Sequence, residues 1–584
     1  MRHWLGTRLR AGRFCMSSGR FAGWVAPAVR LVAEVFFDWH VLLLSVVVLA
    51  LIGALRFGNL ANLALPLWVD SVHHSAIIRL ILAQGGLPTS YRPFADVDTV
   101  YYHLGYHVAV AILARVSGWD VEHVMLVFGQ VLNVFTSVTL YILAWRWTGR
   151  AAAGLMAMVV SGTLSLMPAY YVTWGRYTEL MGLMILPVAM LYTREALENG
   201  RKRQVLFAGI IAGLLFFVHY RVMFFLATFI VAHLVCYTAY AAWRRKPWRH
   251  LWVRATAVAL IGGVIASPWL WRLATTFILP LDTFPARITG NLEYNAVPMD
   301  LVTQNLNPAL YACAVLAAVI GILRRRGRVV VLLAWVVLTV ALVNPNIIGL
   351  SPSWIVNNLS VAIAEIRPLA LMGAFPLHEI LLLIEERVAP AWALRLNSMV
   401  AVGLVVMAFI GGQGLVNIVN PVTVLATKDD VTALEWIKES TPSNAVFLVN
   451  EQIWQGQTYV GTDGGYWIPN LTGRRTTMPI VFYVEGSPAY VADVNSLAQV
   501  IAAGPNPDDP EFLALLRRHG VTHVYIGAKG GPLSLQRLQA SNYYKPVYNS
   551  GTAWIFVVRY PEGANSPPSE PATSIYRLDG TASR

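Results

Sequence analysis

The architecture is inferred first from residues 39–84, which read WHVLLLSVVVLALIGALRFGNLANLALPLWVDSVHHSAIIRLILAQ. The first part, residues 39–57, is an apolar run close to the ~20 residues that a helix needs to cross a bilayer. Asp70 then opens a second segment, in which apolar residues at helical spacing are mixed with His73 and His74. This order predicts a spanning helix followed by an amphipathic helix over 72–84 that lies on the membrane surface.

The composition extends the membrane prediction to most of the chain. Of 584 residues, 56% are hydrophobic and only 13% are charged, whereas soluble domains carry about a quarter charged residues. The net charge of +13 comes from short basic clusters between apolar runs, so we expect no nucleic acid partner. We therefore predict a polytopic α-helical membrane protein in which membrane lipid surrounds the helices.

Apolar runs of spanning length recur along the chain, and about eleven are predicted to cross the membrane. They are residues 39–57, 121–145, 151–170, 179–195, 204–219, 222–242, 252–272, 308–323, 329–344, 359–384 and 396–419. Residues 101–116 are short and rich in His and Tyr, and are predicted to form a second surface helix. Counting them as a further span would invert every later loop.

The basic residues predict the orientation. Clusters such as 201–203 and 324–326 fall in every second loop, while the loops between them hold single basic residues. Cytoplasmic loops carry the excess of Lys and Arg. We therefore expect a multi-pass protein of the plasma (inner) membrane, with a cytoplasmic N-terminus and an extracytoplasmic C-terminus.

Four regions follow from these patterns. They are a cytoplasmic tail (1–38), a membrane region (39–425) with an external loop (58–120) carrying two juxtamembrane helices, a small extracytoplasmic α/β domain (426–560) and a disordered tail (561–584). The α/β prediction depends on short strand-like runs such as AVFLVN and THVYIG between glycine- and proline-rich turns. The last region is rich in Pro and Ser.

Ionisable and aromatic residues gather in the predicted external loops. Placing ionisable groups at the edge of the membrane costs free energy, so their presence there suggests a function. The catalytic candidates are Asp70 and Glu179. The substrate-binding candidates are His73, His74, Asp96, Asp98, Tyr101, Tyr102, His103, His107, Arg176, Tyr177, His219, Tyr220, Arg221 and Arg367.

These residue types suit one reaction. An arginine fork binds phosphate bidentately, and a nearby carboxylate can deprotonate a hydroxyl group. Together they indicate transfer of a sugar from a polyprenyl-phosphate donor. Asp70 could instead cap the following helix, and each arginine could extend its side chain toward lipid headgroups. The histidines could be hydrogen-bonding residues or ligands of a divalent metal, the one cofactor that these residue types would suit.

Three stretches resemble the GT-C superfamily of membrane glycosyltransferases: WVDSVHHSAIIRLILAQGGLPTSY (68–91), VYYHLGYHVAVAILARVSGWDVEHVML (100–126) and AWRWTGRAAAGL (144–155). The resemblance covers most of the chain in architecture, including the C-terminal domain of bacterial members. It implies a polyisoprenoid-phosphate-linked donor, inversion at the sugar and Asp70 as catalytic base. It also implies a second acidic residue, at Glu179, Asp96 or Asp98. The acceptor, whether lipid, glycan or protein, stays open.

Other functions remain compatible with this sequence. A transporter or flippase of a lipid-linked glycan, a polymerase or ligase of surface glycans, and a lipid-binding member without turnover would share these features. Transporters usually carry internal repeats and polar groups at the bilayer midplane, neither of which is evident in the sequence. In the C-terminal domain, the motifs GTDGGYW (461–467) and TGRRT (472–476) could bind sugar or could simply form turns.

Overall fold

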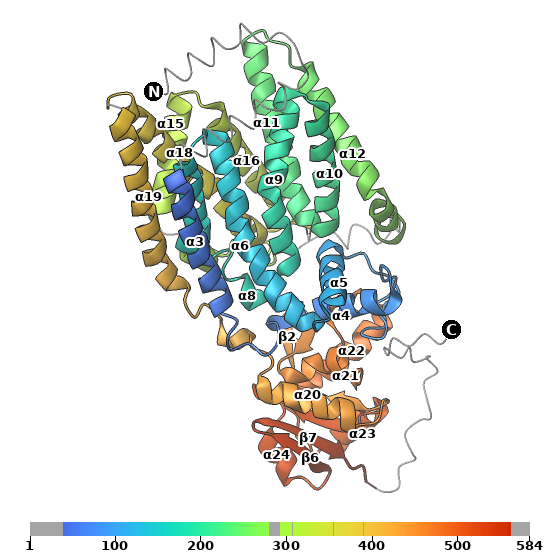
Figure 1. The fold of residues 1–584 in the computed structure, drawn as a ribbon. Coiled ribbons are helices and arrows are strands. Elements are labelled where there is room, and N and C mark those ends of the chain that lie inside the picture. Colours follow the sequence, from blue (N-terminus) through green and yellow to red (C-terminus); the bar gives the residue numbers. More distant parts are fainter. Residues whose placement is uncertain (1–38, 280–291, 306–307, 354, 389, 562–584) are drawn as a thin grey trace.

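The computed structural model describes residues 39–561 except 280–291, 306–307, 354 and 389. A bundle of long helices occupies one part of the molecule, and a smaller α/β domain is attached to one end of it (Figure 1). We refer to this end of the bundle as the domain end. The predictions for the terminal tails fall outside the described residues.

Seven helices of the described chain are long and apolar enough to cross a membrane. They involve α3 (Trp39–Gly58), α6 (Val121–Thr148), α9 (Tyr177–Asn199), α11 (Tyr220–Trp243), α12 (Arg249–Leu273) with η3 (Ala274–Ile278), α17 (Asn358–Ala364) with α18 (Ile366–Glu385), and α19 (Pro390–Gly412). The polytopic helical membrane protein predicted from composition is thereby confirmed.

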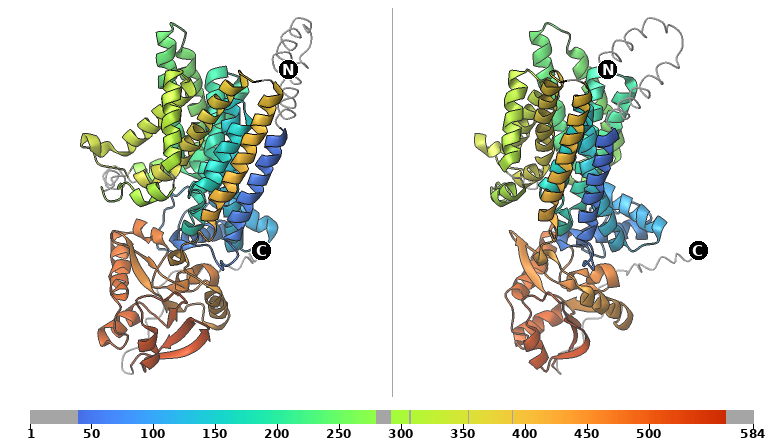
Figure 2. Two further views of the ribbon diagram at one scale, coloured as in Figure 1. Left: turned by 90° about the vertical axis from the view of Figure 1, so that its left-hand side faces the viewer. Right: turned by 60° about the vertical axis from the view of Figure 1, so that its left-hand side comes forward.

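Shorter helices complete the bundle. They are α7 (Ala151–Val159) with η2 (Val160–Leu164), α10 (Lys202–Val218), α15 (Pro308–Leu323) and α16 (Gly327–Val343). Each of the eleven predicted spans coincides with one of the long or short helices. Because only seven meet the length and composition requirements, the count of eleven stays a prediction. Two views at other angles show the bundle helices running side by side, with the C-terminal domain beyond their ends (Figure 2).

Two helices lie between the bundle and the C-terminal domain: α4 (Trp68–Gln84) and α5 (Gly105–Ser117). They correspond to the two predicted surface helices. However, α4 has no broad exposed face, because Val69, Val72 and Ile78 are fully buried together with Ser71 and His74. Several elements cover the polar side chains of α4. His74 shares a hydrogen bond with His107 of α5, Ser75 and Arg79 bond to Glu122 of α6, and His73 contacts Phe482 of the C-terminal domain.

The C-terminal domain contains a five-stranded mixed sheet in the order β4-β1-β5-β7-β6. The strands are β1 (Val446–Leu448), β4 (Arg475–Thr476), β5 (His523–Ile526), β6 (Tyr544–Ser550) and β7 (Ala553–Val558), with a separate hairpin of β2 (Glu451–Gln455) and β3 (Thr458–Gly461). Strand β1 runs parallel to β4 and β5, and β7 pairs antiparallel with β5 and β6.

Helices surround this sheet. They are α20 (Lys428–Ser440), η7 (Gly464–Trp467), α21 (Ile468–Thr472), η8 (Val481–Glu485), α22 (Pro488–Ala502), α23 (Pro510–Arg518) and α24 (Leu535–Ala540). A capping box fixes the start of α20, since Asp430 accepts hydrogen bonds from the backbone and hydroxyl of Thr427. Short helices in the connections are α8 (Tyr171–Trp174), α14 (Met299–Asn305), η4 (Pro345–Ile348), η5 (Gln413–Leu415) and η6 (Pro421–Thr423).

Candidate functional site

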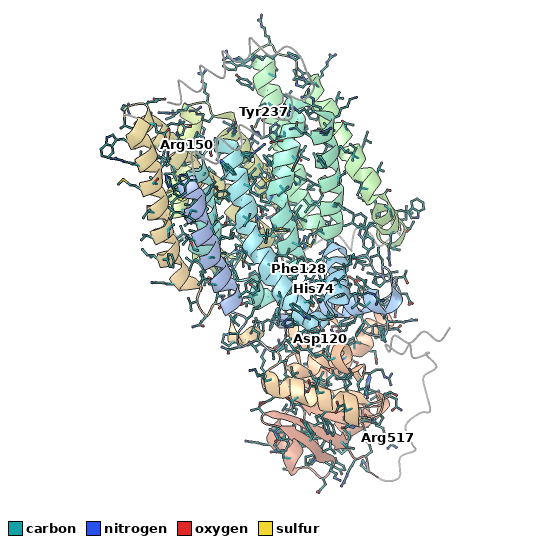
Figure 3. All side chains as sticks on the ribbon, viewed as in Figure 1. His74, Asp120, Phe128, Arg150, Tyr237 and Arg517 are labelled. Atoms are coloured by element: carbon teal, nitrogen blue, oxygen red, sulfur yellow. The ribbon has the colours of Figure 1, made fainter. Side chains whose placement is uncertain are left out.

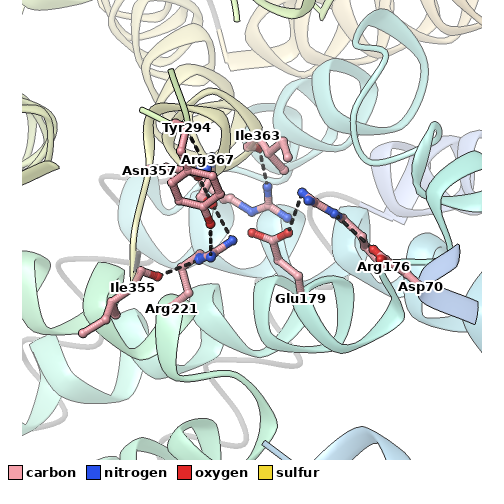
Figure 4. Close-up of polar contacts among 10 residues, drawn as sticks. Asp70, Arg176, Glu179, Arg221, Tyr294, Ile355, Asn357, Ile363 and Arg367 are labelled. Atoms are coloured by element: carbon pink, nitrogen blue, oxygen red, sulfur yellow. Dashed lines mark hydrogen bonds and ion pairs between the residues drawn. The ribbon is translucent and has the colours of Figure 1, made fainter. Parts of the chain in front are cut away.

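Asp70, Arg176 and Glu179 meet at the domain end of the bundle. Asp70 lies in the first turn of α4, Arg176 immediately precedes α9, and Glu179 lies in the first turn of α9. The Nε atom of Arg176 donates to Oδ2 of Asp70 over 3.3 Å, and its NH1 atom lies 3.8 Å from Oε2 of Glu179. Figure 4 shows Arg176 between the two carboxylates. The two catalytic candidates thus share one guanidinium although they are far apart in the sequence.

Gly175 allows this approach. It adopts the left-handed conformation with φ of 65°, which favours glycine. A Cβ atom at this position would lie 2.1 Å from Oγ of Ser71 and 2.7 Å from the carbonyl oxygen of Leu67. Only a residue without a side chain lets the turn before α9 pack this closely on the start of α4, and so brings Arg176 to Asp70.

Arg367 approaches Glu179 from α18. Its side chain is fully buried and its NH1 atom donates to the carbonyl oxygen of Ile363 over 3.1 Å. Its Nε and NH2 atoms have no hydrogen-bond partner within the described structure, and the same holds for NH1 of Arg176. In Figure 4 the guanidinium of Arg367 lies above Glu179. Buried guanidinium groups with unused donors can accept an anion with several oxygen atoms.

Arg221, at the start of α11, is engaged with two loops. Its guanidinium donates to the carbonyl oxygen of Ile355 over 2.8 Å, to Oγ of Ser360 over 3.0 Å and to the hydroxyl of Tyr294 over 3.2 Å. Amide groups hold these loops in turn, because Asn358 donates to the carbonyl oxygen of Asn295 over 2.6 Å. Arg221 therefore connects two loops at the domain end, next to the carboxylate cluster.

Five of the predicted histidines form a buried cluster beside Asp70. Nδ1 of His74 and Nε2 of His107 share a hydrogen bond of 3.0 Å, while the rings of His103 and His219 lie 4.2 Å apart and those of His73 and His74 4.6 Å apart. Burial lowers the pKa of His73 to about 4, although Asp70 opposes this shift, so His73 is neutral at neutral pH.

This cluster does not have the geometry of a metal site. Within the described residues, no group of three or more His, Cys, Asp or Glu side chains is arranged to hold a metal ion. Tyr102 fills the space among the histidines, with its ring 6.0 Å from that of His74 and 5.8 Å from that of His107. The histidines and Tyr102 therefore form a closely packed neutral wall next to the carboxylates.

The other tyrosine candidates pack around this wall. Tyr177 is fully buried and stacks on Tyr106 with ring centres 5.7 Å apart. Tyr220 stacks on His219 at 5.8 Å. Tyr101 lies half-buried in the segment before α5. These contacts are those of packing residues at the edge of the site.

Asp96 and Asp98 are not brought into the carboxylate cluster. Both form ion pairs with Arg92, at 2.6 and 3.3 Å, and their side chains are 58% and 70% exposed. The structure thus places them apart from Asp70 and Glu179, and their predicted part in substrate binding or as a second acidic residue stays a prediction. They lie in a solvent-exposed turn, where like-charged carboxylates are readily accommodated beside an arginine.

The C-terminal motif GTDGGYW (461–467) does not form an exposed sugar-binding surface in the described structure. Asp463, Tyr466 and Trp467 are at most 1% exposed and belong to the domain core. The domain instead reaches the site through Phe482 of η8, whose ring lies 4.9 Å from that of His73. Sequence reasoning missed Phe482, Ser360 and Gly175, because a single aromatic, serine or glycine carries no signal until its neighbours in space are known.

Solved structures share this fold at low sequence identity. The oligosaccharyltransferase AglB from Archaeoglobus fulgidus is 12% identical over 90% of this chain and 75% of its own, with a TM-score of 0.54. ArnT from Cupriavidus metallidurans, in its apo state, is 12% identical over 92% of this chain and 98% of its own, with a TM-score of 0.52. The arabinofuranosyltransferase AftD from Mycobacteria is 15% identical over 90% of this chain and 40% of its own, with a TM-score of 0.55.

The chain therefore shares the fold of these three proteins, which is the fold that the resemblance to GT-C glycosyltransferases implied. None of the curated proteins matches the chain significantly. A family model described as "Family of unknown function (DUF6541)" matches residues 3–355. Because this match covers more than half of the chain, the chain belongs to the DUF6541 family.

Proposed function

We propose that this chain is a membrane glycosyltransferase that moves a sugar from a polyprenyl-phosphate donor to an acceptor at the extracytoplasmic face. The observation that carries the proposal is the cluster of Asp70, Arg176, Glu179 and Arg367. Arg176 pairs with both carboxylates, while Nε and NH2 of Arg367 are buried without a hydrogen bond within the described part of the chain. The AglB structure is described as a complex with a dolichol-phosphate, which supports a lipid phosphate as the group that such donors hold.

In the proposed reaction, Asp70 accepts the proton of an acceptor hydroxyl as its oxygen attacks the anomeric carbon. The new glycosidic bond forms while the bond between the anomeric carbon and the phosphate oxygen breaks. The electron pair of the broken bond leaves with the lipid phosphate, whose negative charge Arg176 and Arg367 neutralise. Attack opposite the leaving phosphate inverts the anomeric configuration. Glu179 orients Arg176 from the other side.

The chemistry requires the domain end to face the extracytoplasmic side, as the distribution of basic residues predicts. A reporter fused after Tyr560 tests this orientation. Alkaline phosphatase activity, which needs an oxidising compartment, is the expected result. Activity of a cytoplasmic reporter alone at this position would contradict both the orientation and the external site.

The central test compares wild type with Asp70→Asn in membranes supplied with labelled polyprenyl-phosphate sugars. Transfer and donor retention are measured separately. We expect Asp70→Asn to lose transfer by about 10²-fold or more, as for removal of a general base, while still retaining donor. Asp98→Asn is the matched control, because its carboxylate is exposed and outside the cluster. Equal transfer by wild type and Asp70→Asn would remove Asp70 from the mechanism.

A second variant tests the phosphate site. Arg367→Gln removes the cation and leaves a shorter, neutral side chain that still carries hydrogen-bond donors. We expect the donor KM to rise at least tenfold, because one charged contact to phosphate is lost. An unchanged KM in both Arg367→Gln and Arg176→Gln would show that these arginines do not hold the donor phosphate.

A further inference from the structure

The C-terminal domain contacts the first turns of α4 at three points that surround Asp70. The Nζ atom of Lys529 lies 5.6 Å from the ring centre of Trp68. Nδ2 of Asn470 donates to the carbonyl oxygen of Val72 over 2.7 Å. The ring of Phe482 lies 4.9 Å from that of His73. The contacted residues are thus two positions before Asp70 and two and three positions after it.

Trp68 has an unusual backbone conformation. Its φ of 65° lies in the left-handed region, which is rare for a bulky residue and persists only where surrounding contacts hold it. Trp68 is the first residue of α4, so its conformation sets where the helix begins and in which direction Asp70 projects. Lys529 lies over the Trp68 ring and is itself anchored, because its Nζ atom donates to the carbonyl oxygen of Val422 over 2.6 Å.

The other two contacts are buried. Asn470 is 2% exposed, and its amide crosses from the domain to the helix backbone one turn after Trp68. Phe482 stacks on Tyr91 at 4.5 Å and lies 5.1 Å from Tyr102, so its ring is fixed by the external loop as well as by α4. The three domain residues therefore act on the backbone and the neighbours of Asp70, on both sides of it along α4.

We propose that Lys529, Asn470 and Phe482 are positioning residues, through which the C-terminal domain holds Asp70 in the orientation that proton transfer requires. This inference rests on the proposed function of Asp70 as base. It assigns the domain a part in the catalytic step, whereas a domain that only covers the site or binds an acceptor at a distance would leave the orientation of α4 unchanged.

The test uses the full-length protein and the variant Lys529→Met. Lys529 is exposed, so its substitution leaves the domain core intact. We expect kcat to fall about three- to tenfold with donor KM changed less than twofold, because a small misplacement of a catalytic group lowers the rate without loss of binding. Lys529→Arg, which keeps a cation over the indole, should restore kcat to near the wild-type value. The double variant Lys529→Met/Phe482→Leu should lose more than either single variant.

Lys545→Met is the matched control, an exposed lysine of the same domain on strand β6. A kcat of Lys529→Met equal to that of Lys545→Met would overturn the inference. So would a parallel loss of kcat, donor affinity and thermal stability in Lys529→Met that Lys529→Arg does not rescue. Asp70→Asn, measured beside these variants, separates the two proposals. If Asp70→Asn is inactive and Lys529→Met is normal, only the positioning role fails, whereas an active Asp70→Asn removes the proposed base itself.

Discussion

Gly175→Ala is the substitution whose effect can be worked out most fully from the structure. An alanine at φ of 65° carries the cost of the left-handed conformation, about 1–2 kcal/mol. Its Cβ atom would also lie 2.1 Å from Oγ of Ser71 and 2.7 Å from the carbonyl oxygen of Leu67. The serine side chain can rotate away, but the carbonyl belongs to the backbone at the start of α4. Overpacking of this kind adds about 1–3 kcal/mol.

Gly118→Ala provides the matched control. Gly118 ends α5 in the same conformation, with φ of 71°, but a Cβ atom there would have no atom within 4 Å. Gly118→Ala should therefore lose only the stability that an alanine in the left-handed conformation costs. We expect Gly175→Ala to destabilise the protein by about 2–5 kcal/mol against about 1–2 kcal/mol for Gly118→Ala. Because the strained turn separates Arg176 from Asp70, transfer should also fall in Gly175→Ala only.

The assay is thermal denaturation of both purified variants in the same detergent, combined with transfer and donor-binding measurements. The double variant Gly175→Ala/Ser71→Ala should recover part of the stability, since the Oγ contact is removed while the Leu67 carbonyl remains. Equal stability loss in Gly175→Ala and Gly118→Ala, with unchanged transfer in both, would refute the reasoning that this glycine joins Arg176 to Asp70.

Three further predictions concern other parts of the molecule. Burial raises the pKa of Glu451 to about 8 from 4.5, so the protein loses stability as the pH rises from 4.5 through 8 and Glu451 ionises in its buried position. Glu451→Gln should remove this pH dependence and be more stable than wild type at pH 9 by about 5 kcal/mol, and an unchanged pH profile in thermal denaturation would contradict it. Asp98→Asn should change stability by less than about 1 kcal/mol, because the carboxylate is exposed beside Arg92, and a larger loss in the melting curve would be unexpected. Arg150→Met should destabilise the protein by about 1–3 kcal/mol, since Glu385 loses its ion pair with Arg150 but keeps the hydrogen bond from Asn397. A donor affinity reduced along with stability would count against a purely structural role.

Much of the membrane architecture could be predicted from the sequence, because spanning length and apolar composition are properties of contiguous residues. The helix at 68–84 could be predicted for the same reason, from the spacing of its apolar residues. The burial of its polar side chains could not be predicted, because it depends on segments distant in the sequence. Glu122 of α6 binds Ser75 and Arg79, and Phe482, about 400 residues further along the chain, contacts His73. The spacing of apolar residues predicts a helix and its apolar side, but not which distant segment of the chain packs against it.

The candidate site could likewise be predicted from the sequence only in part. Placing Asp70, Arg176 and Glu179 on one face required only their positions relative to the spans, and the structure brings them together. Asp96 and Asp98 had the same residue type and the same external location, yet they face water with Arg92. Asp70 and Glu179 come together because the turn at Gly175 packs closely on the start of α4. This contact depends on tertiary packing and cannot be inferred from the spacing of residues along the chain.

The exposure of the arginines distinguishes the two ends of the bundle. At the end remote from the C-terminal domain, where Arg150 lies in Figure 3, Arg150 faces Glu385, and Glu379 lies between Arg324 and Arg326. The side chains of Arg324 and Arg326 are 42% and 45% exposed, so water solvates their charge.

At the domain end, the side chain of Arg367 is fully buried, and its Nε and NH2 atoms have no hydrogen-bond partner within the described structure. Leaving the donors of a buried charged group unused costs free energy. The guanidinium of Arg367 lies above Glu179 in Figure 4, next to Arg176. An anion that accepted hydrogen bonds from these donors would remove that cost, and under the proposed function this anion is the phosphate of the sugar donor.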